Sequence, residues 1–151
     1  MPKSPIRLYA VVLALLVGLY SGAAGAAELK VLSTEAMRAT LQELAPAFEA
    51  ASGHKLVIAF ATDGDVEKKV ASDETIDIAI LTKPGADKLV KNARLVGGTA
   101  EVLARGSSPD LVYMVGASFA CDRPLAAKAL IDFLIGPAAK KVFQAKGLQT
   151  S

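Results

Sequence analysis

Two short clusters of hydroxyl and carboxylate side chains each follow an apolar run directly. The first is STE at residues 33–35, after LKVL; the second is TDGD at residues 62–65, after LVIAFA. Both runs have the composition of strands, and both clusters precede helical patterns. In an open parallel sheet, ligands bind beyond the carboxyl ends of the strands, where helix N-termini offer free N–H groups to an anion. The sequence therefore predicts non-covalent binding of a small ligand at the positions Ser33, Thr34, Thr62 and Gly64.

An alternative role for these residues is helix capping, because hydroxyl side chains begin many helices. Three carboxylates, Glu35, Asp63 and Asp65, fall at the same two helix starts. Each stabilises its helix through the dipole. Each would also repel an anion, at a cost of roughly 4 kcal/mol for charges ~4 Å apart at an effective dielectric constant of about 20, before screening. A cation is a further alternative, but these acids are far short of a calcium loop, so we expect capping or turn roles and no metal site.

Catalytic motifs are absent from the sequence. It contains no G-x-S-x-G, phosphate-binding P-loop, H-E-x-x-H or cysteine–histidine cluster. Cys121 and His54 are single residues of their types, and no pattern brings them together. Asp77 and Asp132 lie in or beside apolar runs, where we expect structural acids with partners. The expected class is a binding protein without a cofactor rather than an enzyme.

Strand and helix patterns alternate through the first part of the chain. The expected strands are 28–33, 56–60 and 75–81, and the expected helices are 34–53, 66–74 and 82–92. This alternation is typical of an α/β fold with right-handed crossovers. The apolar face of the first helix consists of Met37, Leu41, Leu44 and Phe48. Pro46 lies inside this pattern and is expected to bend or divide the helix.

The alternation changes after Gly98. A short helix or strand at 99–110 and a strand at 110–116 lead to helices at about 124–135 and 137–146. Together these patterns predict one small, mostly parallel sheet flanked by helices.

The N-terminal segment has the three parts of a secretory signal peptide. Lys3 and Arg7 give a positive start, residues 8–20 are almost wholly apolar, and Ala24 and Ala26 form an A-x-A cleavage pattern. The alternative is a membrane anchor, because residues 8–27 are just long enough to span a bilayer of ~30 Å. We expect cleavage after Ala26, which leaves residues 27–151 as one domain in the periplasm.

The charge balance of residues 27–151 argues against a nucleic-acid partner. The whole chain has 17 basic and 15 acidic residues, and Lys3 and Arg7 in the predicted leader account for the excess. Nucleic-acid binding requires a basic face, which a balanced chain does not provide. The single cysteine, Cys121, cannot form an internal disulfide.

Two long stretches resemble a known family. ELKVLSTEAMRATLQELAPAFEAASGHKLVIAFATDGDVEKKV followed by IDIAIL is similar to the start of periplasmic solute-binding proteins of ABC transporters, the molybdate-binding type above all. AAKALIDFLIGPAAKKVFQAKGL, residues 126–148, resembles the end of the same proteins. The resemblance implies a type 2 periplasmic-binding fold, binding of a solute such as molybdate or another oxyanion, and an ABC permease as partner.

Proteins of this family have two α/β lobes, the second inserted into the first. Residues 27–98 and 118–151 match the parts that build the first lobe, and residues 99–117 are a shortened connection where the second lobe would be. In the molybdate binders, each of the first two strand-end loops offers a serine hydroxyl to the oxyanion. An ungapped alignment puts Ala36 and Asp63 at those positions.

A single lobe leaves two functional hypotheses. One is ligand capture for ABC-type transport, with a homodimer supplying the second wall of the site. The other is a remnant that has lost its ligand and acts as a protein-interaction module. An apolar patch at the strand ends would favour the interaction module, and a concave polar mouth would favour ligand binding.

Overall fold

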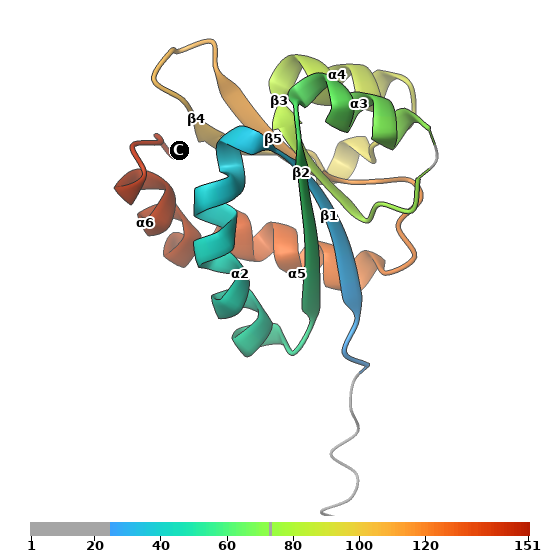
Figure 1. Cartoon of the computed structure of the whole chain (residues 1–151), viewed down its shortest axis with the longest axis horizontal. Helices are drawn as coiled ribbons and strands as arrows, with labels where there is room; N and C mark the ends of the chain where they lie inside the picture. Colours follow the sequence, from blue (N-terminus) through green and yellow to red (C-terminus); the bar gives the residue numbers. More distant parts are fainter. Residues whose placement is uncertain (1–24, 73) are drawn as a thin grey trace, which may run out of the picture.

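A five-stranded sheet forms the centre of the molecule. The structure, a computed structural model, describes residues 25–72 and 74–151. The predicted signal peptide, except for its last two residues, lies outside them. Along the sheet the strand order is β2-β1-β3-β5-β4 (Figure 1). The strands are β1 (Glu28–Thr34), β2 (Lys55–Ala61), β3 (Ile78–Thr82), β4 (Glu101–Arg105) and β5 (Val112–Ala117).

The sheet is mixed. Strand β1 pairs in parallel with β2 and with β3, whereas β5 runs antiparallel to both β3 and β4. The reversal arises because loop 106–111 joins β4 to β5 as a hairpin, closed by the Gly106 N–H donating to the Leu111 carbonyl. The predicted α/β fold is confirmed, and its sheet has as many antiparallel as parallel pairings.

Helices cover both faces of the sheet (Figure 1). On one face lie α2 (Arg38–Ser52), α5 (Pro124–Ile135) and α6 (Pro137–Ala145); on the other lie α3 (Asp63–Ala71) and α4 (Lys83–Lys91). Two short 3-10 helices, η1 (Glu35–Met37) and η2 (Gly97–Thr99), complete the described elements. Each face has its own hydrophobic core: Phe48 and Phe143 are fully buried in the first, Val66 and Leu89 in the second.

Helix α2 buries the face that the sequence predicts. Leu41, Leu44 and Phe48 are each no more than 3% exposed. The helix runs unbroken from Arg38 to Ser52 through Pro46, so of the two effects predicted for this proline the division is wrong, and the bend stays a prediction. Proline removes one backbone hydrogen bond and crowds the preceding turn. Burial of Leu44 before Pro46 and Phe48 after it offsets this cost.

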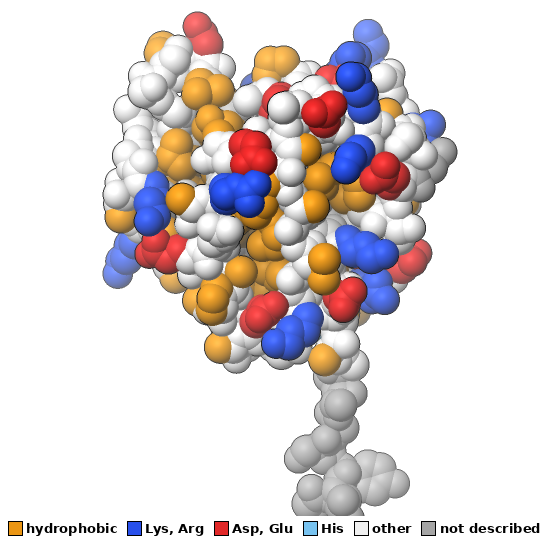
Figure 2. Space-filling model, in the orientation of Figure 1, with side chains coloured by type: hydrophobic (Ala, Val, Ile, Leu, Met, Phe, Trp, Pro, Cys, Tyr) orange, Lys and Arg blue, Asp and Glu red, His pale blue; other side chains and the backbone are white. Residues whose placement is uncertain are grey.

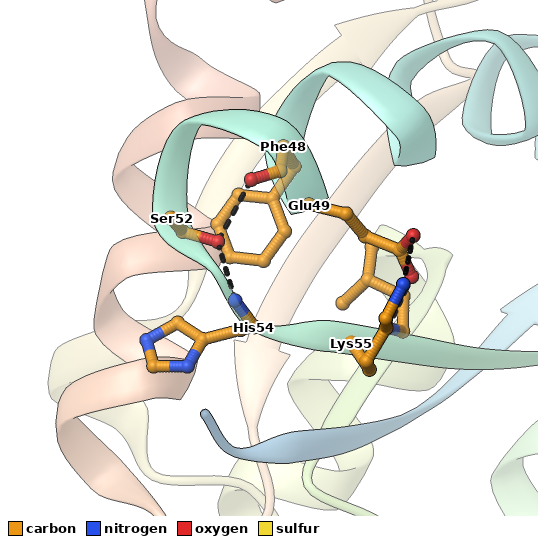
Figure 3. A network of polar contacts seen from close by, with 6 residues as sticks. Phe48, Glu49, Ser52, His54 and Lys55 are labelled. Atoms are coloured by element: carbon orange, nitrogen blue, oxygen red, sulfur yellow. Dashed lines mark hydrogen bonds and ion pairs between the residues drawn. The ribbon is translucent and has the colours of Figure 1, made fainter. Parts of the chain in front are cut away.

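The end of α2 is fixed by a small polar network (Figure 3). Gly53 has φ 74°, a left-handed conformation that glycine adopts without strain, and its N–H donates to the Glu49 carbonyl. The Ser52 hydroxyl donates to the Phe48 carbonyl and accepts from the His54 N–H. This network sets the direction in which the chain enters β2.

Two side chains of the same junction hold neighbouring backbone. The Glu49 carboxylate accepts from the Leu56 N–H at 2.8 Å, and this bond is the main cause of its lowered pKa. His54 Nδ1 accepts from the Ala27 N–H at 3.1 Å. His54 therefore has a structural role, tying the segment before β1 to the start of β2.

Candidate functional site

The carboxyl ends of β1, β2 and β3 lie at one edge of the sheet, the strand-end edge. In register, Thr34 is opposite Ala61 and Ser33 is opposite Ile80. Helices η1, α3 and α4 begin at this edge, and the β4–β5 loop lies at the same end of the sheet (upper side of Figure 1). The fold therefore brings the two sequence clusters together at the place where the sequence predicts a ligand.

Asp63 connects two of the strand-end loops. It is the first residue of α3 and is half-buried. Its Oδ1 accepts the Thr82 N–H at 2.9 Å, and its Oδ2 accepts the Thr82 hydroxyl at 2.5 Å. Thr82 is the N-cap residue of α4. The Asp63 carboxylate thus occupies the N-terminus of the neighbouring helix, where the helix dipole favours a negative charge.

Gly85 and Tyr113 lie beside this carboxylate. A Cβ atom on Gly85, in the first turn of α4, would be 3.5 Å from Asp63 Oδ2. Tyr113 faces Thr82 across the β3–β5 pair and is 6% exposed. Burial raises the pKa of Tyr113, and the charge of Asp63 adds to the rise. Thr82 and Tyr113 thus place neutral polar side chains near this carboxylate.

The four predicted ligand-binding residues lie at this edge, and the side chains of two of them bond to their own chain. Ser33 is fully buried and its hydroxyl donates to the Thr34 carbonyl at 3.1 Å. Thr34 is 6% exposed and makes no side-chain cap bond. Thr62 caps α3: its hydroxyl accepts the Asp65 N–H and donates to the Asp65 carboxylate at 2.8 Å.

Gly64 is exposed, and a Cβ added there would meet no atom within 4 Å. Its backbone is therefore open to solvent, as the predicted role requires, but the position does not need glycine for steric reasons.

The other two acids of the edge have cationic partners. Glu35 accepts two hydrogen bonds from Arg38, at 2.8 and 2.7 Å, and the pKa of its carboxyl is lowered chiefly by this bonding. The Arg38 guanidinium in turn lies 4.3 Å from the centre of the Phe60 ring. Asp65 has Lys68 at 3.9 Å. Each charge is thus partly compensated in place.

Arg38 and Tyr113 were not predicted from the sequence as part of the site. The spacing of Glu35 and Arg38, three residues apart on one helix surface, is a signal that could have indicated the pair. No sequence signal could have indicated Tyr113, because its position depends on β5 entering the sheet antiparallel to β3.

A concave surface, the α5 groove, lies elsewhere on the molecule. It has a volume of about 480 Å³ and lies between η2, the end of β5 and the start of α5. Phe119 and Leu125 on its lining are 62% and 84% exposed. The groove is at the amino-terminal end of the parallel strands, because Ala117 at the end of β5 faces Ile78 at the start of β3.

Cys121 lines the α5 groove and lies near a buried acid. Burial is the main cause of its raised pKa, to which the Asp77 carboxylate contributes. Asp77 is fully buried, and its Oδ2 accepts the Lys30 N–H at 2.8 Å. Asp77 therefore has a structural partner. A raised pKa keeps the Cys121 thiol protonated, which is unfavourable for a nucleophile.

Charges of both signs are mixed over the surface. Figure 2 shows acidic and basic side chains interspersed on the face in view, with no large area of one sign. Within residues 25–72 and 74–151, no three histidine, cysteine or acidic side chains gather as metal ligands. In the same residues, no helix has the length and apolarity to cross a bilayer.

Comparison with known proteins identifies the family. The family described as "Bacterial extracellular solute-binding protein" matches residues 29–115, more than half of the chain. The chain therefore belongs to this family, whose members are binding proteins. No curated protein matches the chain at a significant level.

Solved structures share the fold at low sequence identity. The substrate-binding domain of a putative molybdenum ABC transporter from Clostridium difficile superposes with a TM-score of 0.77 at 10% identity, covering 83% of this chain and 99% of that one. The periplasmic molybdate-binding protein of Azotobacter vinelandii superposes with a TM-score of 0.74 at 11% identity, covering 82% of this chain and 99% of that one. A tungstate ABC transporter protein of Geobacter sulfurreducens superposes with a TM-score of 0.63 at 12% identity, covering 78% of this chain and 98% of that one. At these identities the similarity establishes the fold, a lobe of the periplasmic-binding type.

Proposed function

We propose that this protein binds a small solute non-covalently at the strand-end edge and serves ABC-type transport. The observation that carries the proposal is that the carboxyl ends of β1, β2 and β3 and the starts of α3 and α4 meet at this edge. Neutral donors at a helix N-terminus are suited to an anion. An oxyanion of the molybdate type is therefore the first candidate ligand, and the molybdate and tungstate proteins of the same fold support this choice.

The proposed location is the periplasm. Residues 1–26 have the pattern of a cleavable signal peptide, and the family is described as extracellular. A solute-binding protein in this compartment would deliver its ligand to an ABC permease in the membrane, which is the proposed partner.

Residues 99–117 are proposed to be a shortened connection in place of a second lobe. They form η2, β4, the hairpin loop and β5, and this loop lies at the strand-end edge. One lobe leaves a ligand half-exposed, whereas small-molecule sites bury most of their ligand. We propose that a second copy, related by a twofold axis, covers the edge when ligand is bound.

The test is a thermal-shift screen of the protein from residue 27 onward. The panel contains molybdate, tungstate, sulfate, phosphate and divalent cations at millimolar concentration. A ligand at 100 times its Kd adds about 2.7 kcal/mol of stability. A midpoint raised by one oxyanion supports the proposal, and a cooperative melt unchanged by every compound contradicts it.

A matched pair of variants locates the response. Thr34 lies at the strand-end edge with no side-chain cap bond, whereas Thr75 is exposed before the start of β3, at the other end of the sheet. Thr34→Val should reduce the ligand-induced shift, and Thr75→Val should leave it unchanged. Equal effects of both variants would place the ligand elsewhere.

The second candidate function is that of a protein-interaction module. It is favoured by the exposed Phe119 and Leu125 at the α5 groove. The strongly exposed large apolar side chains in the described residues are these two and Val57 in the middle of β2, none at the strand ends. The strand-end edge therefore has no such patch, which favours ligand binding there. An unresponsive thermal-shift screen would make the interaction module the better hypothesis.

A further inference from the structure

We propose that the α5 groove is a binding site for a small cationic amphiphile, a molecule with an apolar body and one positively charged head group. The groove lies at the amino-terminal end of the parallel strands, away from the strand-end edge. The inference therefore goes beyond the proposed function and does not depend on it.

The groove has the size of a ligand site and follows the length of α5. Its volume of about 480 Å³ is within the range of roughly 300–1,000 Å³ that is usual for small-molecule sites. One wall runs from Pro124, in the first turn of the helix, to Ile135, its last residue. At about 1.5 Å per residue this wall is about 16 Å long, so the groove suits an elongated ligand.

Apolar side chains provide the contacts for the body of the ligand. Phe119 and Leu125 on the lining are two of the three large apolar side chains that are strongly exposed in the described residues. Ile131 and Ile135 extend the apolar lining along α5. A ligand that covered these side chains would remove apolar surface from water, which is favourable.

The charged side chains on the lining leave a net negative charge. They are Glu101, Lys128 and Asp132. Lys128 donates to the Asp132 carboxylate at 2.5 Å, so these two charges compensate each other. Glu101, at the start of β4, is exposed and makes no ion pair with another described residue. A groove with an excess of one negative charge favours a cation over an anion.

A buried carboxylate adds negative potential behind the groove at Cys121. Burial is the main cause of the raised pKa of Cys121, and the carboxylates of Asp77 and Asp122 add to the rise. In the described residues, Asp77 Oδ1 is the one buried side-chain oxygen or nitrogen without a hydrogen-bond partner. Such an atom is uncommon in a folded protein. The chain itself thus compensates Asp77 only through the Lys30 N–H on Oδ2, which leaves an attraction for a cation in the groove.

Phe119 indicates the end of the groove at which the head group binds. It precedes Cys121 by two residues on the same lining, and its ring is exposed. A cation is attracted to the face of an aromatic ring. The head group is therefore placed near Phe119 and Cys121, and the apolar body extends along α5 toward Ile135.

The experiment is an NMR titration of the protein from residue 27 onward with octylammonium, octanol and octanoate. The three probes share one apolar chain, differ in the charge of the head group, and are used below the concentrations at which they form micelles. We expect octylammonium to shift the amide signals of residues 96–101 and 117–135. Its Kd should be at least about fivefold lower than that of octanoate, because one head group is attracted and the other repelled.

A matched pair of variants tests the charge of the groove. Glu101→Gln removes the unpaired acid of the lining, whereas Glu74→Gln removes an exposed acid of another hollow, beside β1 and β2. Glu101→Gln should raise the Kd for octylammonium about threefold without changing that for octanol, and Glu74→Gln should change neither. Phe119→Ser should weaken the binding of both probes, and the exposure of this side chain should leave the fold intact.

Three results would overturn the inference. The first is an equal Kd for octylammonium and octanoate, or signal shifts confined to residues outside the groove. The second is no binding of any probe, which would leave the groove to a protein partner. The third is self-association of the free protein that Phe119→Ser abolishes, which would assign the groove to a second copy. None of them bears on oxyanion binding at the strand-end edge, which the thermal-shift screen tests separately.

Discussion

The loops after β1 and β2 begin with the same kind of dipeptide, a threonine followed by an acid, and use it differently. At Thr34-Glu35 the acid stays exposed and pairs with Arg38 of the following helix. At Thr62-Asp63 the acid turns inward and binds Thr82 of another loop. The difference shows that the neighbouring element decides the role of a strand-end acid. Glu35 pairs with the helix that directly follows it, whereas Asp63 joins α3 to α4 at the candidate site.

Removal of the Asp63 carboxylate should have the largest effect on stability. Asp63→Ala leaves the Thr82 N–H and hydroxyl without their acceptor in a half-buried place. The free energy of unfolding should fall by about 2 kcal/mol, as for other polar groups that lose a partner. Urea denaturation followed by circular dichroism measures this. A loss no larger than that of Glu35→Ala would contradict the distinction between the two loops.

Thr62→Ala should have an intermediate effect. The Thr62 hydroxyl caps α3 through the Asp65 N–H, whereas Thr34 makes no such bond. Loss of an N-cap side chain costs about 1 kcal/mol. The same denaturation assay applies, with Thr34→Ala as the comparison. A larger loss in Thr34→Ala would show that the two loops have been assigned the wrong way round.

Glu35→Gln should have the smallest effect, visible mainly in the pH dependence. The pKa of Glu35 is lowered in the folded protein by its bonds to Arg38. This contribution to stability is present above the pKa of an unfolded glutamate, about 4.3, and is lost as pH falls through the folded value. As pH decreases from about 5 to about 3, the melting temperature should therefore fall less steeply for Glu35→Gln than for the unmodified protein. Parallel curves would contradict the role of this pair.

Much of the fold follows from local pattern. The expected strands and helices match the observed ones to within a few residues, because apolar periodicity and Gly53 at the end of α2 are local signals. The presence of both parallel and antiparallel strand pairs in the sheet was harder to predict. The direction of β5 depends on a hairpin to β4, and the 99–110 segment carries no period that separates helix from strand.

The candidate site could be located but not described from the sequence. The strand-end rule places residues 33–35 and 62–65 at one edge, since parallel strands end together. Whether Asp63 faces solvent or Thr82 depends on how α3 packs against α4. That contact joins residues 19 positions apart, which no local pattern specifies.

The place of β5 in the sheet has a consequence for synthesis of the chain. Strand β5 lies between β3 and β4, so the strand made late inserts beside one made early. Until residues 112–117 leave the ribosome, β3 lacks one of its two neighbours, and until α5 and α6 follow, α2 lacks its partners in the first core. The lobe therefore cannot close its core until nearly the whole chain has been made. Such delayed folding is compatible with the proposed export of the chain. It also leaves an unpaired, aggregation-prone strand edge in any product that stops short of β5.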